Sequence, residues 1–410
     1  PRIQNTSQPP GRQSRSEPAS GAETLRGAPR EAGRSGGEPR AASPTRAMQR
    51  ALVLARRGMG QTHPNPPVGA VVVRDGIVVG EGYHAGYGQP HAEAVALDQA
   101  GAAARGATLY VTLEPCNHEG RTPPCVAGIL AVVIGIAAPN PKSGHGARAL
   151  REAGVEVAYA ADRRQAAHLI AGFTSWVERT RPRFTVKVAA SLDGRLASSR
   201  GDSRWISSPT ARAWVHRRRR EADAILVGAE TALRDNPELT VRAVSGNSPD
   251  RILLDSTLRL RTDARAWRDD GVRRIAVTTE LAPAEKRDAL RAKGVEVWVF
   301  PAGPDGRIPL RALAERLGTE GYTNVLVEGG GILVGALLAA HLADCIWLFQ
   351  SPRLLLGGGG APGWTEGLQV PAVARALRLT RTDFRRLGPD WLVTAVPEYA
   401  QWWDPEAVHV

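Results

Sequence analysis

Cysteine and methionine are scarce in this 410-residue chain, with three and two residues respectively, and long apolar runs are missing. The longest such run, residues 332–340, is far too short to cross a bilayer, so we predict no membrane partner. The hydrophobic content of 42% is ordinary for a soluble protein. A chain of this length is expected to form two domains, each large enough to bury its own core.

Lysine is also rare, because it occurs only at positions 142, 187, 286 and 293, although the net charge is +12. Arginine therefore carries nearly all the positive charge, which indicates a coding bias as readily as a nucleic-acid surface. The four arginines at 217–220 are typical of a solvated helix face, and the phosphate of a small substrate suits them as well as DNA does. We predict no nucleic-acid partner.

Two short motifs carry the most specific chemistry in the chain. The first is Pro90-His91-Ala92-Glu93, and the second runs from Pro115-Cys116 to Cys125, with eight residues between the two cysteines. One His and two Cys form the ligand set of a catalytic zinc that keeps its fourth position open for water. Glu93 then transfers protons, as in the His-x-Glu and Pro-Cys signature of zinc-dependent base deaminases.

The main alternative for this motif is a closed structural zinc, for which His84 or His118 could supply the fourth ligand. With Cys116 and Cys125 assigned to the metal, Cys345 is left alone. No disulfide can then form without dismantling the metal site, which favours a reducing, cytoplasmic setting.

Periodicity and turn residues divide the chain into four parts. Residues 1–44 hold few large apolar side chains, so a disordered tail is expected there. In the next part we expect helices at 45–57, 91–104, from 126 onward and 163–178, strands at 70–73, 77–82, 108–113 and 132–137, and a helix and strand within 148–157. No turn residue separates the helix expected from 126 from the strand that follows, so that helix is about one turn long or the strand is shifted.

After Arg181-Pro182-Arg183 a second α/β domain with a mainly parallel sheet is expected. Its predicted strands are 184–190, 224–228, 251–255, 274–278, 295–300, 324–328, 345–350 and 391–396. Glycines at 329–331 precede a helix at 332–340, so that a phosphate could approach the helix N-terminus. The glycines at 357–360 are expected to form a loop rather than a second phosphate site.

Several motifs in the same order resemble those of the bifunctional riboflavin-biosynthesis family, in which a pyrimidine deaminase is fused to a pyrimidine reductase. The similarity extends over residues 48–396. Besides the two motifs above, it rests on Thr62-His63-Pro64-Asn65-Pro66, Thr112-Leu113-Glu114, Gly120-Arg121-Thr122-Pro123-Pro124, Ser191-Leu192-Asp193-Gly194-Arg195, Trp205-Ile206-Ser207-Ser208-Pro209, Asp235-Asn236-Pro237-Glu238-Leu239-Thr240-Val241-Arg242 and Glu328-Gly329-Gly330.

The resemblance implies an α/β chain with a three-layer, cytidine-deaminase-like domain at 45–180 and a dihydrofolate-reductase-like domain at 181–398, followed by a C-terminal tail at 399–410. It implies Zn²⁺ in the first domain and NADPH in the second. The substrate would be the pyrimidine ribose phosphate 2,5-diamino-6-ribosylamino-4(3H)-pyrimidinone 5′-phosphate, first deaminated and then reduced to the ribityl compound. We also expect a homo-oligomer that assembles through the reductase domain.

The matching positions imply specific contacts in the reductase domain. The residues expected to line NADPH are Ala189, Trp205, Thr231, Asp235, Ser256, Gly330, Gly331, Ile332, Leu333, Val334, Gly335 and Ala336. Those expected to face the substrate are Ser203, Arg219, Leu239, Arg242 and Glu328. The side chains of Arg219 and Arg242 suit a sugar phosphate. The arginine run at 217–220 is therefore expected to serve substrate binding in part.

Two departures from the family pattern lie in the deaminase half. The family usually has several more residues between the second Cys and the next strand, and an aspartate where this chain has Ala138. The aspartate is expected to hold the ribose of the substrate, so deamination would be impaired while zinc still binds. The alternatives are therefore a reductase with a degraded deaminase domain, an RNA base deaminase with a C-terminal binding module, and a non-catalytic regulatory protein.

Overall fold

The computed structural model describes residues 43–116, 129–139 and 145–399. The expected tails, the residues around Cys125 and the start of the helix expected from 126 lie outside these ranges. Within them the chain forms one five-stranded and one nine-stranded sheet. Among the described helices, none is long and apolar enough to cross a membrane.

The five-stranded sheet has the order β2-β1-β3-β4-β5. Its strands are β1 (Gly69–Arg74), β2 (Ile77–Tyr83), β3 (Thr108–Val111), β4 (Ala131–Ile134) and β5 (Glu156–Tyr159). β1 is antiparallel to β2 and β3, whereas β3, β4 and β5 are parallel. The hairpin expected at Asp75-Gly76 is therefore confirmed, and both residues take the positive φ that such a turn requires.

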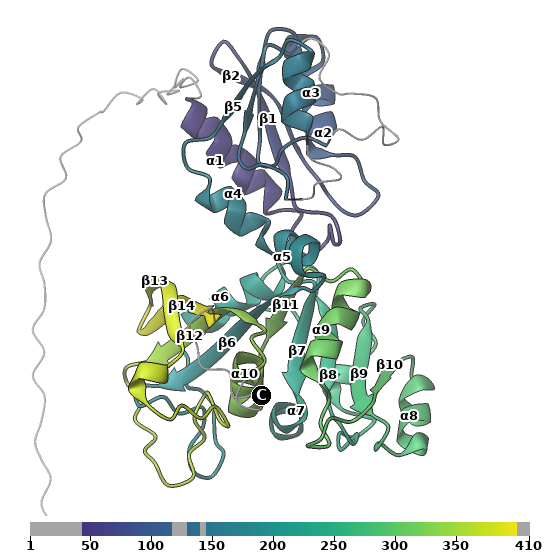
Figure 1. The fold of residues 1–410 in the computed structure, drawn as a ribbon, viewed down its shortest axis with the longest axis vertical. Coiled ribbons are helices and arrows are strands. Elements are labelled where there is room, and N and C mark those ends of the chain that lie inside the picture. The colour runs from purple at the N-terminus through teal and green to yellow at the C-terminus, as the bar shows by residue number, and fades with distance from the viewer. Residues whose placement is uncertain (1–42, 117–128, 140–144, 400–410) are drawn as a thin grey trace, which may run out of the picture. The chain divides into compact units, whose positions relative to one another are not determined.

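Helices cover both faces of this sheet (Figure 1). They are α1 (Pro44–Ala55), α2 (Ala92–Ala100), α3 (Gly146–Glu152), α4 (Arg164–Leu169) and α5 (Ala171–Arg179), with a short 3₁₀ turn η1 (Gly101–Ala104) after α2. Ala70 and Val72 of β1 pack with α2 and α3, while Val71 and Val73 pack with α1 and α4. The alternation of side chains along the strand thus builds a three-layer domain.

Three details differ from the sequence predictions. His91 is the N-cap of α2 in an extended conformation, not a residue of its first turn. The helix expected at 163–178 is divided into α4 and α5 at Ile170. β4 begins at Ala131, one residue earlier than expected, and pairs directly with β3.

The nine-stranded sheet has the order β10-β9-β8-β7-β11-β6-β12-β14-β13. It contains β6 (Arg183–Ser191), β7 (Ala224–Gly228), β8 (Asp250–Leu254), β9 (Arg274–Thr279), β10 (Glu296–Phe300), β11 (Asn324–Val327), β12 (Ala343–Ser351), β13 (Arg378–Leu387) and β14 (Asp390–Glu398). In this order, all neighbouring strands from β10 as far as β12 are parallel to one another. β14 and β13 follow as antiparallel strands at one edge of the sheet. All the predicted strands are confirmed, but β13 was missed because its exposed, arginine-rich residues lack an apolar alternation.

Five helices and two 3₁₀ turns accompany this sheet in the described part of the chain. They are α6 (Pro209–Arg219), α7 (Ala229–Asp235), α8 (Ala284–Arg291), α9 (Leu310–Thr319), α10 (Gly331–Ala339), η2 (Arg265–Trp267) and η3 (Val373–Arg375). Alternate residues of β7 pack into two different hydrophobic cores. Ala224 and Leu226 belong to one core, and Ile225 and Val227 belong to the other. Helices therefore pack on both faces here too, which leaves the carboxyl ends of the parallel strands to form a site.

Candidate active sites

Two predicted zinc ligands lie together in the first domain. His91, at the N-cap of α2, places its Nδ1 3.6 Å from Sγ of Cys116, which follows β3. Two atoms bound to one tetrahedral zinc at about 2.05 Å and 2.3 Å would be about 3.6 Å apart, so this pair fits a shared metal. Cys125 lies outside the described residues, and within them no group of three or more His, Cys, Asp or Glu side chains is placed to hold a metal ion.

His84 is already engaged on both ring nitrogens. Its Nδ1 lies 3.1 Å from the carbonyl oxygen of Pro90, which only accepts, so Nδ1 carries the proton. Its Nε2 then accepts a hydrogen bond from Nδ2 of Asn65 at 3.4 Å. Burial lowers the pKa of this His, which keeps the ring neutral. His84 thus supports the backbone just before His91 and is a poor fourth ligand for a closed zinc site; His118, the other candidate, lies outside the described residues.

Each of the two predicted zinc ligands His91 and Cys116 has a glutamate two residues away in the sequence. Glu93 lies in the first turn of α2 and is partly buried, and burial raises the pKa of its carboxyl group. Glu114 accepts hydrogen bonds from the backbone N–H of Ala138 at 3.0 Å and of Ala147 at 2.9 Å. It therefore ties the segment after β4 and the start of α3 to the end of β3, where Cys116 follows.

A cavity of about 1180 Å³ opens in the second domain at the carboxyl ends of the parallel strands. The predicted cofactor residues that line it are Ala189, Trp205, Thr231, Asp235, Ser256, Gly330, Gly331, Ile332, Leu333 and Ala336, and the predicted substrate residues that line it are Ser203, Arg219, Leu239, Arg242 and Glu328. Val334 instead lies in the core, and Gly335 faces Glu366. A cavity of this size accommodates a dinucleotide and part of a second ligand.

Sequence reasoning missed several residues of the cavity wall. Lys187 precedes Ala189 on the same face of β6, and His216 lies one turn before Arg219 on α6. The period of two along the strand and the helical spacing from Arg219 would have found both. Arg212 lies over the ring of Trp205 at 4.3 Å and donates to Ser207 O at 2.5 Å.

Glu328, directly after β11, is the centre of the polar wall. Its Oε1 accepts from Nε of Arg219 at 2.6 Å, its Oε2 accepts from Nη2 of the same residue at 3.0 Å, and Nζ of Lys187 lies 3.6 Å from Oε2. Burial alone would raise the pKa of Glu328, but Arg219 and Lys187 outweigh it and lower the pKa to about 2. The wall therefore holds an ionised carboxylate between two cations at neutral pH.

His216 is a neutral imidazole beside this wall. Its Nδ1 accepts a hydrogen bond from the backbone N–H of Arg242 at 3.4 Å. Burial, together with Arg219 and Arg242, lowers its pKa to about 4.

We expect His216 to make the reductase domain less stable in mild acid. Its pKa is about 4 in the folded chain against 6.5 for an exposed histidine, so the unfolded chain binds the proton first as the pH falls through that interval. When the pH is lowered from about 7 to about 4.5, the melting temperature of the His216→Gln variant should fall less than that of the parent. Equal losses in the two proteins, measured by calorimetry, would contradict this assignment.

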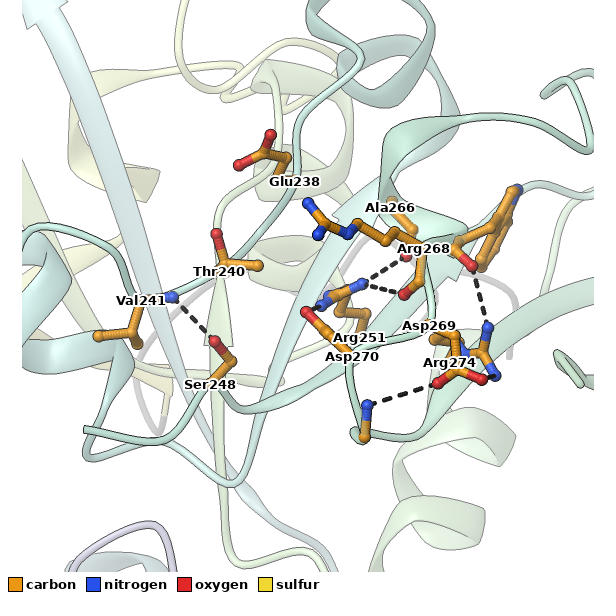
Figure 2. A network of polar contacts seen from close by, with 12 residues as sticks. Glu238, Thr240, Val241, Ser248, Arg251, Ala266, Arg268, Asp269, Asp270 and Arg274 are labelled. Atoms are coloured by element: carbon orange, nitrogen blue, oxygen red, sulfur yellow. Dashed lines mark hydrogen bonds and ion pairs between the residues drawn. The ribbon is translucent and has the colours of Figure 1, made fainter. Parts of the chain in front are cut away.

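A network of polar contacts around Arg251 holds the loop 266–270 (Figure 2). The buried Arg251 of β8 donates through Nη1 to Ala266 O at 3.0 Å and Arg268 O at 2.9 Å, and its Nη2 pairs with Asp270. Arg265, in the same loop, pairs with Glu238. Oε2 of Glu238 also lies 3.7 Å from Nη1 of Arg242. The loop that Arg251 holds in place is therefore linked through Arg265 and Glu238 to a predicted substrate residue.

Family models match both parts of the chain. The model for the "RibD C-terminal domain" matches residues 182–393, and the model for the "Cytidine and deoxycytidylate deaminase zinc-binding region" matches residues 42–136. A riboflavin biosynthesis protein RibD from Synechocystis is 38% identical over 353 residues, 85% of this chain and 94% of that protein. The chain belongs to the RibD family.

Other RibD proteins match as completely. The RibD of Escherichia coli is 39% identical over 362 residues, covering 84% of this chain and 96% of its own length. The crystal structure of a deaminase/reductase of this family from Thermotoga maritima has a TM-score of 0.74 at 36% identity and covers 86% of this chain and 98% of that one. An Acinetobacter baumannii RibD structure has the same TM-score at 35% identity.

The expected architecture is thereby confirmed. As a RibD protein, the chain combines a cytidine-deaminase-like zinc domain with the RibD reductase domain, and it is a bifunctional enzyme of riboflavin biosynthesis. Its cofactors are Zn²⁺ and NADPH. The reading as an RNA deaminase with a binding module is wrong, because the C-terminal half is the RibD reductase domain.

Proposed function

We propose that this chain deaminates 2,5-diamino-6-ribosylamino-4(3H)-pyrimidinone 5′-phosphate and then reduces its ribosyl group with NADPH to give 5-amino-6-ribitylaminouracil 5′-phosphate. The Thermotoga maritima relative is named a diaminohydroxyphosphoribosylaminopyrimidine deaminase and 5-amino-6-(5-phosphoribosylamino)uracil reductase. The observation that carries the proposal for the second step is the cavity of about 1180 Å³ in which residues from β6, α6, α7, β8 and the start of α10 meet.

In the deaminase half, His91, Cys116 and Cys125 would hold the zinc. The bound metal would lower the pKa of a water molecule so that hydroxide is available near neutral pH. Glu93 would carry a proton on its carboxyl group and hand it to the departing amine. Burial supports this role because a carboxyl group with a raised pKa exchanges protons more readily near neutral pH.

In the reductase half, charge would order the ligands in the cavity. NADPH supplies the hydride when bound. The ionised Glu328, held by Arg219 and Lys187, would accept hydrogen bonds from the sugar hydroxyls of the substrate. Arg219 already donates from Nη1 to Thr240 O and makes two bonds to Glu328, so the more exposed Arg242 would be the main partner of the phosphate.

The domain limits belong to the same proposal, with a tail at 1–44, the deaminase domain at 45–180, the reductase domain at 181–398 and a tail at 399–410. The start of α1 at Pro44 and the start of the deaminase family match at residue 42 support the first limit to within three residues, and the start of β6 at Arg183 and of the reductase match at residue 182 support the limit between the two domains. We further propose that the protein works in the cytoplasm on a small molecule, without a nucleic-acid or membrane partner, as a homo-oligomer assembled through the reductase domain.

A mass-resolved assay tests the two steps. The purified protein is incubated with the diaminopyrimidine ribose phosphate, with and without NADPH. Deaminated product without NADPH, and its reduced form with NADPH, are expected. If only supplied aminouracil substrate is reduced, the deaminase half is inactive, which is the alternative favoured by Ala138 and the short segment after Cys125.

We expect Ala138→Asp to strengthen substrate binding in the deamination step. A regained hydrogen bond to the ribose would lower KM by about 5- to 150-fold, equivalent to about 1–3 kcal/mol. The backbone N–H of residue 138 is held by Glu114, so the new side chain would start from a fixed position. The same substitution combined with a longer segment after Cys125 provides the second test. If neither protein gains in KM or rate, the proposed impairment is wrong.

A further inference from the structure

The Ser191-Leu192-Asp193-Gly194-Arg195 motif, which has no role in the proposed chemistry, makes a series of contacts with residues far along the chain. Asp193 Oδ1 accepts from Ser191 Oγ at 2.5 Å and from Leu356 N at 3.1 Å, and its Oδ2 accepts from Gly357 N at 2.7 Å. Leu192 N also donates to Leu354 O at 2.9 Å. The turn after β6 therefore binds the beginning of the segment 354–368.

The same turn holds the middle of that segment. Leu196 N donates to Pro362 O at 2.9 Å, and Nη1 of Arg195 donates to Ala361 O at 3.2 Å. Arg195 also forms an isolated antiparallel bridge with Gly363. Segment 354–368 is thus attached on both sides of the glycines at 358–360, through residues 354–357 and 361–363.

The end of the segment lies against the first turns of α10. A Cβ atom at Gly331 would be 2.1 Å from Gly363 O, and one at Gly335 would be 2.2 Å from Glu366 O. These two glycines are four residues apart and lie on one face of the helix. Their lack of a side chain is explained by the backbone of segment 354–368, which packs directly on that face.

The first turn of α10 also borders the cavity. Gly330, Gly331, Ile332 and Leu333 line it, and a Cβ atom at Gly330 would lie 3.3 Å from Oγ1 of Thr231. Pro362 and Glu366 of the segment and Leu196 of the turn line it too. Segment 354–368 therefore packs against the helix terminus at the cavity and contributes to the cavity wall beside it.

We propose that Asp193 is a positioning residue for NADPH, which acts by holding segment 354–368 against the glycine face of α10. This inference rests on the proposed reductase function. The three donors to Asp193 lower its pKa to about 2, so its charge is constant over the working range of the enzyme. Gly335 then contributes to cofactor binding through segment 354–368, whereas Gly331 both lines the cavity and makes room for the segment.

Two variants disturb this packing from opposite ends. Asp193→Ala removes the acceptor for Leu356 and Gly357, and Gly335→Ala inserts a methyl group against Glu366 O at a position that faces the segment. Gly358→Ala is the matched control, because that glycine lies in the same segment with open space around its missing Cβ and without a positive φ.

The measurements are the Kd of NADPH by calorimetry, the KM for NADPH and kcat at saturating NADPH, on the full chain. We expect Kd and KM to rise about tenfold or more in Asp193→Ala and Gly335→Ala, with kcat within about twofold, because the loss is one of ground-state binding. The Gly358→Ala control should bind NADPH as the parent does. Thermal unfolding shows whether each variant is folded at the assay temperature.

The possible outcomes separate the two proposals. Unchanged NADPH affinity in both folded variants, or equal losses of kcat and kcat/KM without a change in Kd, would overturn the positioning role while leaving the reductase function intact. If one variant does not fold, the other decides. A parent protein that neither binds NADPH nor reduces the aminouracil substrate would overturn the proposed reductase function and this inference with it.

Discussion

Replacing Arg251 with methionine is expected to lower the free energy of unfolding of the reductase domain by about 1–3 kcal/mol. The guanidinium group is fully buried, and its loss leaves two carbonyl groups, of Ala266 and Arg268, and the carboxylate of Asp270 without their donor (Figure 2). Ala266 is buried, so its carbonyl group becomes an unpaired acceptor in the interior, whereas Asp270 is exposed and can be hydrated. Urea unfolding of the parent and the variant, followed by tryptophan fluorescence, measures it.

Two controls make this result specific. Arg261→Met removes an arginine whose side chain is 82% exposed and paired with Asp263, so a change within about 0.5 kcal/mol is expected. The double variant Arg251→Met/Asp270→Leu replaces both charges and should recover part of the loss, since an apolar pair avoids the unpaired carboxylate. If Arg251→Met lowers the free energy of unfolding by less than about 1 kcal/mol, the loop 266–270 is held by other contacts and Arg251 contributes little to stability.

The Glu93→Gln variant should lose about two to four orders of magnitude in deamination rate. Glutamine has nearly the same shape but cannot carry the proton, so the structure around His91 should be retained. Zinc content by atomic emission is expected to equal that of the parent, and the reduction of supplied aminouracil substrate should be unchanged. The Kd of zinc and the reductase rate thus report on folding independently of the lost step.

Asp98→Asn is the matched control for that experiment. Asp98 is an exposed carboxylate on the same helix, α2, so its neutralisation tests whether a lost negative charge on this helix is enough to slow deamination. It should keep the parent rate. If the Glu93→Gln variant deaminates the substrate at more than about a tenth of the parent rate, Glu93 is not the residue that carries the proton.

Much of this enzyme could be recognised in the sequence because its determinants are local. The His-x-Glu and Pro-Cys spacing indicated the zinc chemistry, and the strands were found because parallel strands buried on both faces form continuous apolar runs. β13 escaped detection because it becomes a strand by pairing with β14 and is mostly exposed, so its residues show no buried alternation. Local sequence cannot reveal pairing that depends on a neighbour.

Several roles were decided only by the tertiary structure. Lys187 and Arg219 are 32 residues apart but meet at Glu328, and their combined charge lowers the pKa of its carboxyl group. His84 looked like a possible zinc ligand until its ring nitrogens were found beside Pro90 O and Asn65. Arg251 was expected only as the first residue of a strand, and it can be buried because loop 266–270 supplies acceptors for it.

The sequence by itself determined the family and the two activities, and nearly all the residues that it assigned to the reductase ligands line the cavity. The tertiary structure alone decided how the glycines at 330, 331 and 335 differ. Gly330 borders the cavity, Gly335 makes room for segment 354–368, and Gly331 does both. The physical reason is that glycine in a sequence records only that a side chain is missing, and the atoms that occupy the vacated space come from elsewhere in the fold.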